Sequence, residues 1–308
     1  MNGPLRSTAS HKNDALRHHA REIREVGFSS RKGYSVLRAI RDGCRFLSGG
    51  AVLRQDRLSL FFGHASRPCL PHVAQRGYRS FCRVRRRTER HENPQRRAHI
   101  FIADYHHGVM VLEPKTAKVT PFLDFKPFES FKGLNDLVFG RNGDLYFTDQ
   151  GQTGLHDATG RVYRFSAGGR LELLVETLPG PNGLVLSPDE KTLYVGSRNN
   201  AIWWQPLRDT HPPFRTGTFA IMPGFGTPDG MAIDVDGNVV CVQTNMGVIW
   251  VFNKIGLPIY RIETCTSDKL TNVAYGGPEN KTMFILDGHG KILTAQMPVA
   301  GLQMYSHT

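Results

Sequence analysis

"KGLNDLVFGRNGDLYFTDQG", residues 132–151, places a turn rich in Gly, Asn and Asp between two short apolar runs, as β-hairpins do. Its first run opens on Asn135 and Asp136, residue types that strands usually avoid. A single pair of this kind is most simply explained as a local turn, because both side chains can hydrogen-bond to their own backbone. A recurrence of the same opening along the chain would need another explanation.

The opening does recur, in "PNGLVLSPDEKTLYVG" from Pro181, "PDGMAIDVDGNVVCVQ" from Pro228 and "TNVAYGGPENKTMFILD" from Thr271. Its polar residues are separated by 47, 47 and 43 positions and are Asn135, Asn182, Asp229 and Asn272. Each unit continues with a second apolar run and further strand-like text. A repeat of about 45 residues with four strands is typical of a β-propeller blade.

One more half-repeat lies upstream, where "IFIAD" from Ile100 mirrors "LYFTD" from Leu145. Its polar opening is expected near residue 90, in a segment that no apolar strand follows. The sequence therefore predicts an all-β, six-bladed propeller whose first blade is missing or degenerate. The last blade lacks a fourth strand of its own. In a closed ring that strand often comes from the N-terminus, so a damaged N-terminus would leave both the first and the last blade incomplete.

Charge divides the chain into two parts. Residues 1–99 carry a net charge of +15, whereas residues 100–308 carry −3. We therefore expect a basic, poorly ordered or atypical N-terminal segment over 1–99 and the propeller domain over 100–308. Nucleic-acid binding by the basic segment is disfavoured, because it lacks a stacking pattern of aromatic residues and zinc-ligand spacing. An alternative is that residues 1–99 are not the natural N-terminus, and that a gene-model or splicing difference replaced the first blade.

The cysteines, the apolar runs and the N-terminal residues bear on metal binding, membrane association and the location of the protein. The five cysteines are odd in number and show no CxxC spacing, which disfavours a disulfide framework or a zinc site. No apolar run approaches the length of a spanning helix, so no membrane partner is expected. Without a secretory signal we expect a cytoplasmic protein. The Arg and Ser content of the first 50 residues leaves a mitochondrial location as the alternative.

Propeller geometry gives the polar openings a shared function. The innermost strand of each blade lines the central channel, so Asn135, Asn182, Asp229 and Asn272 are expected to surround one point near the axis. Amide and carboxylate oxygens without His or Cys favour calcium over zinc or copper, and other divalent cations remain possible. The alternative is that these side chains only satisfy backbone groups at the strand starts.

The four motifs resemble the senescence marker protein, gluconolactonase and luciferin-regenerating enzyme family of six-bladed propellers, over about residues 100–308. This resemblance implies a calcium-dependent hydrolase of the lactonase type, with Asn135, Asn182 and Asp229 as metal ligands and Asn272 beside the metal. The family glutamate from the first blade, in a Glu-Gly-Pro context, has no counterpart here. Its absence motivates an alternative: a catalytically impaired propeller that acts as a binding or scaffold module.

The implied reaction opens a small sugar lactone or a related lactone, with Asp229 activating water or attacking directly. Because the second strand of each blade returns to the face where the ligands begin, the residues after it are expected to form the rim of the pocket. His289 is a candidate proton shuttle there. The candidate substrate-binding residues are Asn135, Tyr105, His106, Gln150 and Arg198. The sequence predicts neither the particular lactone nor the oligomeric state.

Overall fold

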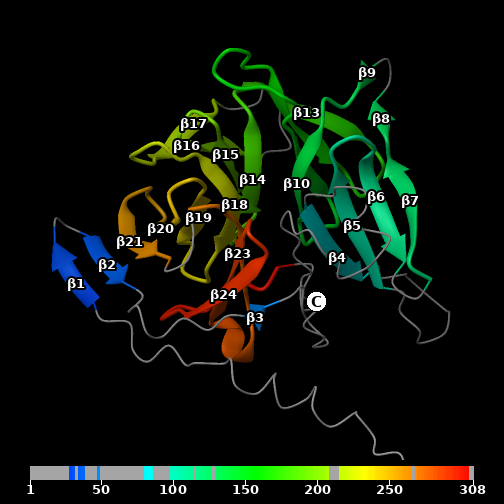
Figure 1. The fold of residues 1–308 in the computed structure, drawn as a ribbon. Coiled ribbons are helices and arrows are strands. Elements are labelled where there is room, and N and C mark those ends of the chain that lie inside the picture. Colours follow the sequence, from blue (N-terminus) through cyan, green and yellow to red (C-terminus); the bar gives the residue numbers. More distant parts are fainter. Residues whose placement is uncertain are drawn as a thin grey trace, which may run out of the picture.

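The computed structural model describes residues 98–113, 116–126, 129–207, 215–264 and 268–304, together with the backbone of four short strands nearer the N-terminus. The described residues form β-sheets almost throughout (Figure 1), and the single helix among them is the short 3-10 turn η1 (Pro278–Asn280). Five sheets contain a run of four neighbouring antiparallel strands. The all-β propeller prediction is therefore confirmed.

Three blades are continuous in sequence and follow the predicted repeats. The first is β10 (Leu134–Phe139), β11 (Leu145–Asp149), β12 (Gly160–Phe165) and β13 (Leu171–Leu178). The next is β14 (Pro181–Leu186), β15 (Thr192–Ser197), β16 (Ala201–Pro206) and β17 (Gly217–Ile221). The third is β18 (Pro228–Ile233), β19 (Val239–Gln243), β20 (Val248–Phe252) and β21 (Pro258–Glu263).

The other two blades draw strands from the N-terminal third. One comprises β4 (Ser80–Arg85), β5 (Ala98–Asp104), β6 (Gly108–Glu113) and β7 (Lys118–Leu123). The last consists of β22 (Leu270–Gly276), β23 (Thr282–Asp287), β24 (Lys291–Gln296) and β3 (Leu47–Ser48). The last blade thus obtains its fourth strand, β3, from the N-terminal third, although a damaged N-terminus was expected to leave this blade incomplete. Outside these blades lie the hairpin β8 (Phe125–Lys126) with β9 (Glu129–Ser130), and β1 (Phe28–Arg31) with β2 (Tyr34–Arg38), which extends the edge at β21.

The blade count differs from the prediction, because the described residues form five blades and not six. The sequence analysis placed the opening of the upstream half-blade near residue 90, which lies outside the described residues. The structure instead completes that blade with β4, about ten residues earlier, pairing Ser80 with Ala103 and Arg85 with Ala98. The strand was missed because its sequence, SFCRVR, carries neither the polar opening nor the turn that mark the other repeats.

The hydrophobic core lies in layers between neighbouring blades. One layer joins the blades that begin with β10 and β14, through residues such as Val138, Leu184 and Leu193. Another joins the blades that begin with β18 and β22, through Val240 and Ile285 among others. The second strands β11 and β19 are buried along their whole length, because a blade packs on each of their faces. This packing fixes the inner strands that carry the candidate ligands.

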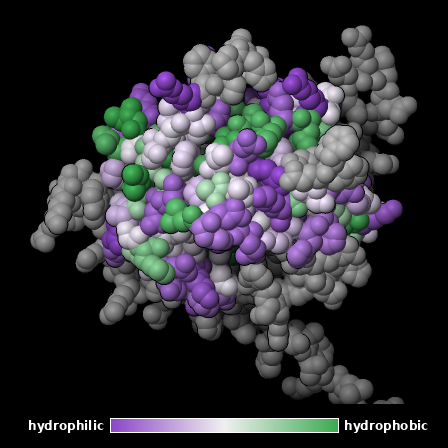
Figure 2. Space-filling model, turned by 90° about the horizontal axis from the view of Figure 1, so that it is seen from above, coloured by the Kyte–Doolittle hydropathy of each residue, from purple (hydrophilic) through white to green (hydrophobic). Residues whose placement is uncertain are grey.

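The exposed surface differs from these buried layers in the distribution of its apolar side chains. Seen from above, its hydrophobic patches are separate and lie among hydrophilic side chains (Figure 2). Within the described residues, no helix has the length and hydropathy needed to cross a bilayer.

Candidate metal centre and its rim

Each inner strand that opens on a candidate ligand contains an irregularity at that opening. In β10, β14 and β18 the pairing register slips by one residue across the positions that hold Asn135, Asn182 and Asp229. In β22 the slip falls between Leu270 and Asn272. A β-bulge re-aims the side chains at its position, and bulges are frequent beside active sites. The four openings therefore share a backbone device as well as a sequence pattern.

Close backbone approaches show that these openings meet. A Cβ on Gly183, next to Asn182, would overlap the carbonyl oxygen of Asp229 in the neighbouring blade. A Cβ on Gly230, next to Asp229, would overlap the side chain of Asn272 in the blade after that. Glycine at both positions lets three successive strand openings pack against one another.

A threonine connects the fourth opening to this group. Thr148 in β11 accepts a hydrogen bond from the backbone N–H of Asp136 at 3.1 Å and donates one to the carbonyl of Asn182 at 2.8 Å. Asp136 itself accepts a bond from the N–H of Leu137 at 2.9 Å, so its carboxylate braces the strand start. The structure thus brings the four predicted ligand positions to one end of neighbouring inner strands.

The polar atoms of this group differ in how they are satisfied. Asn135 and Asn182 are both 7% exposed, and within the described structure the buried Oδ1 of Asn182 has no hydrogen-bond partner. Asn272 Oδ1 accepts the N–H of Val273 at 2.8 Å. A buried oxygen without a hydrogen-bond partner lowers the stability of the fold unless a ligand or an ion binds it. Amide oxygens with one carboxylate fit calcium, and the described residues contain no cluster of three or more His, Cys, Asp or Glu side chains suited to a metal.

A buried thiol lies beside the acidic member of this group. Cys241 in β19 is fully buried, and burial together with the nearby charge of Asp229 raises the pKa of its thiol. A thiol with a raised pKa is a poor nucleophile near pH 7. Of these two side chains, Asp229 is therefore the candidate for acid–base or nucleophilic chemistry.

Two of the predicted substrate-binding residues lie together on the rim. Gln150 follows β11 and is 1% exposed, and among the described residues its Nε2 has no hydrogen-bond partner. Arg198 follows β15, is exposed, and donates from Nη2 to Gln150 Oε1 at 3.5 Å. An amide donor and a guanidinium at one place can bind an oxygen-rich ligand.

Tyr105 and His106, which are also predicted to bind substrate, lie on the turn between β5 and β6. Tyr105 OH and Gln152 Nε2 are 2.7 Å apart, and a Cβ on Gly133 would stand 2.6 Å from the Tyr105 ring. The ring therefore covers the backbone two residues before Asn135. His106 is exposed, and its ring centroid lies 5.1 Å from that of Tyr105.

His289 lies on the corresponding turn after β23. Its side chain is 53% exposed, and its Nδ1 is 3.1 Å from Oδ1 of the buried Asp287. His107 makes the same kind of contact with Asp104 at 2.9 Å. In both pairs a buried carboxylate orients a solvent-facing imidazole.

The sequence analysis missed these carboxylates at the ends of second strands. Asp149 is the most informative of them, because its Oδ1 accepts the N–H of Gly133 at 2.8 Å, and its Oδ2 lies 2.9 Å from both Nε and Nη2 of Arg161. Burial raises the pKa of Asp149, while the Gly133 N–H and the Arg161 charge act in the opposite direction. The shared final Asp of "IFIAD", "LYFTD" and "MFILD" was the available signal.

Comparison with known protein families settles the relationship of the chain. The family model described as the SMP-30/Gluconolactonase/LRE-like region matches residues 93–289, which include all four polar openings and His289. The chain belongs to the SMP-30/gluconolactonase/LRE-like family. The resemblance inferred from the repeat motifs is thereby confirmed.

Individual members of this family align over part of their length. A gluconolactonase of Zymomonas mobilis is 33% identical over 205 residues, covering 60% of this chain and 56% of that protein. The lactonase drp35 of Staphylococcus aureus is 33% identical over 135 residues, covering 42% of this chain and 41% of that protein. The chain therefore spans about half the length of the curated relatives that it matches.

Two solved structures agree with this fold. Regucalcin from Agrobacterium tumefaciens, a calcium-binding protein, has a TM-score of 0.58 at 22% identity, covering 68% of this chain and 76% of its own. A gluconolactonase from Xanthomonas campestris has a TM-score of 0.56 at 23% identity, covering 65% of this chain and 69% of its own. Both likenesses concern the propeller fold.

Proposed function

We propose that the chain is a calcium-dependent hydrolase of the gluconolactonase type, which opens a sugar lactone or a related small lactone. The observation that carries this proposal is the meeting of four bulged strand openings, one of which leaves the buried Asn182 Oδ1 unpaired within the described structure. The relatives named gluconolactonase and lactonase support the same reaction class.

In this proposal the oxygens of Asn135, Asn182, Asp229 and Asn272 hold the calcium ion. When bound, calcium polarises the lactone carbonyl and stabilises the negative charge that develops on its oxygen. Other divalent cations that prefer oxygen ligands fit the same donors. The tight backbone packing at the bulges keeps the donors in place before any ligand arrives.

Asp229 supplies the nucleophile in one of two ways. As a general base it removes a proton from water, whose oxygen then bonds to the carbonyl carbon while the ring C–O bond breaks. As a carboxylate nucleophile it forms an acyl-enzyme that water hydrolyses in a second step. The released ring oxygen takes up a proton, which His289 delivers, with Asp287 orienting the imidazole through Nδ1.

Substrate orientation falls to the rim. Gln150 Nε2 and the Arg198 guanidinium offer donors to hydroxyl or carbonyl oxygens of the lactone. Tyr105 and His106 stand at the edge of the neighbouring blade, and Asn135 contacts substrate as well as metal. Donors of this kind suit a small, oxygen-rich ligand.

The candidate metal centre contains few carboxylates for binding calcium. The family resemblance implies a first-blade glutamate, but β4 contains no acidic residue. Asp229 is then the single carboxylate among the four ligands, and calcium affinity falls with ligand charge. This observation favours the second candidate function, a propeller that retains its fold and binds a small molecule without turnover.

Hydrolysis of glucono-δ-lactone by the full chain tests the proposal, with proton release followed in a pH-stat. We expect turnover with calcium, loss of turnover after chelation, and recovery when calcium is restored. Asp229→Asn is expected to lower kcat by about 100-fold or more. Asn253→Ala, in the turn after β20 at the opposite end of its blade, serves as the control and is expected to leave kcat unchanged. A folded, calcium-loaded chain without turnover would favour the binding module.

A further inference from the structure

The loop between β17 and β18 exposes an aromatic side chain at the end of the blade that carries the candidate ligand Asp229. Phe225 is 82% exposed and lies four residues before Asp229. Met246, in the turn between β19 and β20, is 36% exposed. Both segments lie at the end of the blade where the ligand opening is found, because Pro228 at the start of β18 pairs with Gln243 at the end of β19.

This loop is fixed by hydrogen bonds from both sides. Gln243, which is fully buried, donates from Nε2 to the carbonyls of Pro223 and Gly226 at 2.9 and 2.8 Å. Asn200, from the preceding blade, donates from Nδ2 to the carbonyl of Gly224 at 2.8 Å. The exposed ring is therefore carried on an ordered backbone, and a ligand that contacts it incurs little additional loop-ordering entropy.

Met246 packs against the backbone of this loop. A Cβ on Gly224 would stand 3.0 Å from Met246 Cε, and one on Gly226 would stand 2.7 Å from Met246 Cγ. The methionine side chain thus lies along the residues on both sides of Phe225. Its flexible thioether adapts to apolar groups of different shape.

Other exposed apolar side chains lie at the opposite end of the same blade. Ile255 and Leu257 are 70% and 56% exposed in the turn after β20, at the end of the blade opposite Asp229. Single apolar residues on a surface are ordinary and need no ligand to explain them. The Phe225 loop differs because it is held from two blades and lies at the same end of its blade as Asp229.

We propose that Phe225 and Met246 bind an apolar substituent of the substrate, so that the chain prefers lactones that carry an alkyl or aryl side chain. The inference rests on the proposed function, since it places the lactone carbonyl at Asp229. In this arrangement the polar ring of the substrate meets Gln150 and Arg198, and its side chain extends over the Phe225 loop.

Binding of two ketones that cannot be hydrolysed tests this preference separately from turnover. 2-Methylcyclopentanone and 2-pentylcyclopentanone differ by four methylenes, and their dissociation constants can be measured calorimetrically with the full chain and calcium. Complete burial of one methylene favours binding about fourfold, and half burial about twofold. We expect the pentyl compound to bind about 16-fold more tightly to the unmodified chain.

Variants at the two ends of the blade locate the effect. Phe225→Ser is expected to lower the preference to about fourfold or less, and Met246→Ser to lower it by a smaller factor. Ile255→Ser is the matched control and should retain the full preference. Equal affinity for both ketones in the unmodified chain, or an unchanged preference in Phe225→Ser, would overturn the inference.

Hydrolysis of γ-valerolactone and γ-nonalactone then separates the two proposals. Ketone preference without hydrolysis of these two lactones or of glucono-δ-lactone contradicts the proposed function and supports the apolar contact. Hydrolysis of both lactones without ketone preference supports the proposed function and contradicts the apolar contact.

Discussion

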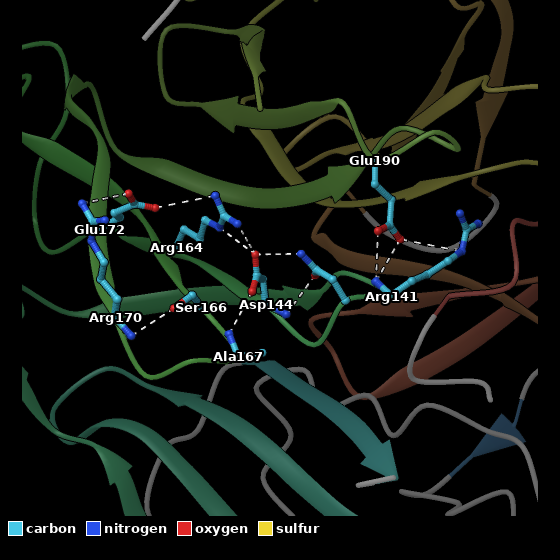
Figure 3. Close-up of polar contacts among 9 residues, drawn as sticks. Arg141, Asp144, Arg164, Ser166, Ala167, Arg170, Glu172 and Glu190 are labelled. Atoms are coloured by element: carbon cyan, nitrogen blue, oxygen red, sulfur yellow. Dashed lines mark hydrogen bonds and ion pairs between the residues drawn. The ribbon is translucent and has the colours of Figure 1, made fainter. Parts of the chain in front are cut away.

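Replacement of Asp144 by alanine is expected to destabilise the propeller strongly without altering the candidate metal centre. The Asp144 side chain is 4% exposed and lies between the turns that join β10 to β11 and β12 to β13 (Figure 3). Its Oδ2 accepts hydrogen bonds from Arg164 Nε at 2.6 Å and Asn142 Nδ2 at 2.9 Å, and its Oδ1 accepts the N–H of Ala167 at 2.8 Å. One carboxylate thus fixes two hairpin turns.

The size of the effect follows from these contacts. Removing one partner of a buried ion pair costs about 3–5 kcal/mol. The lower end applies here, because the Arg164 side chain is 22% exposed and keeps Glu172 at 3.7 Å. Burial lowers the pKa of Arg164, whereas Asp144, Tyr146 and Glu172 raise it, and the net shift is upward. An arginine side chain is not deprotonated in proteins, so the guanidinium stays charged after the substitution. A loss of about 3 kcal/mol lowers the Tm of a domain of this size by about 6–12 °C.

Thermal unfolding of the full chain, followed by circular dichroism, measures this loss. The control is Arg141→Ala, because the Arg141 side chain is 54% exposed and its Nε lies 3.8 Å from Glu190 in the neighbouring blade. An exposed pair of this kind contributes about 0–1 kcal/mol, so the control should lose less than about 4 °C. The reasoning is refuted if Asp144→Ala unfolds within 2 °C of the unmodified chain, or no earlier than Arg141→Ala.

Two further substitutions test the site and its surroundings. Gly230→Ala places a methyl group against the Asn272 side chain, so we expect it to abolish calorimetric calcium binding, whereas Gly168→Ala, whose Cβ would have its nearest neighbour at 3.8 Å, should bind calcium normally. The Asp189 pKa is lowered mainly by the Ser187 hydroxyl, so its stabilising effect is present above the unfolded pKa of 3.8 and is lost as the pH falls through the lower folded value. The Tm difference between the unmodified chain and Asp189→Asn should therefore be larger at pH 7 than at pH 2.5, and an equal difference at both would contradict this assignment.

The sequence predicted those features that recur at fixed spacing. The openings at Asn135, Asn182, Asp229 and Asn272 lie in inner strands because the apolar run after each one is buried between blades. Blade order followed from the same repeat. The bulges could not be predicted, since a register slip depends on the partner strand and leaves no mark in one strand alone.

Other features were missed because they depend on contacts between distant or irregular segments. β4 has no turn signal and lies in a run of arginines, so it was assigned to the basic segment. The pair of Asp149 and Arg161 forms only because β11 and β12 are antiparallel and place the two residues opposite each other. Phe225 lies in the loop between two strands that could be recognised. The position of this loop depends on hydrogen bonds from Gln243, whose sequence context is that of an ordinary strand residue.

Calorimetric titration of the full chain with calcium measures whether the four strand openings bind a metal ion. We expect one calcium ion per chain, with a weak Kd of about 0.1–1 mM because Asp229 is the single acidic ligand. Binding should be lost in Asp229→Ala, weakened at least tenfold in Asn182→Ala, and unchanged in Asn253→Ala. Absence of calcium binding in the folded chain, or binding that survives both ligand substitutions, would contradict the assignment of the four strand openings as a metal centre.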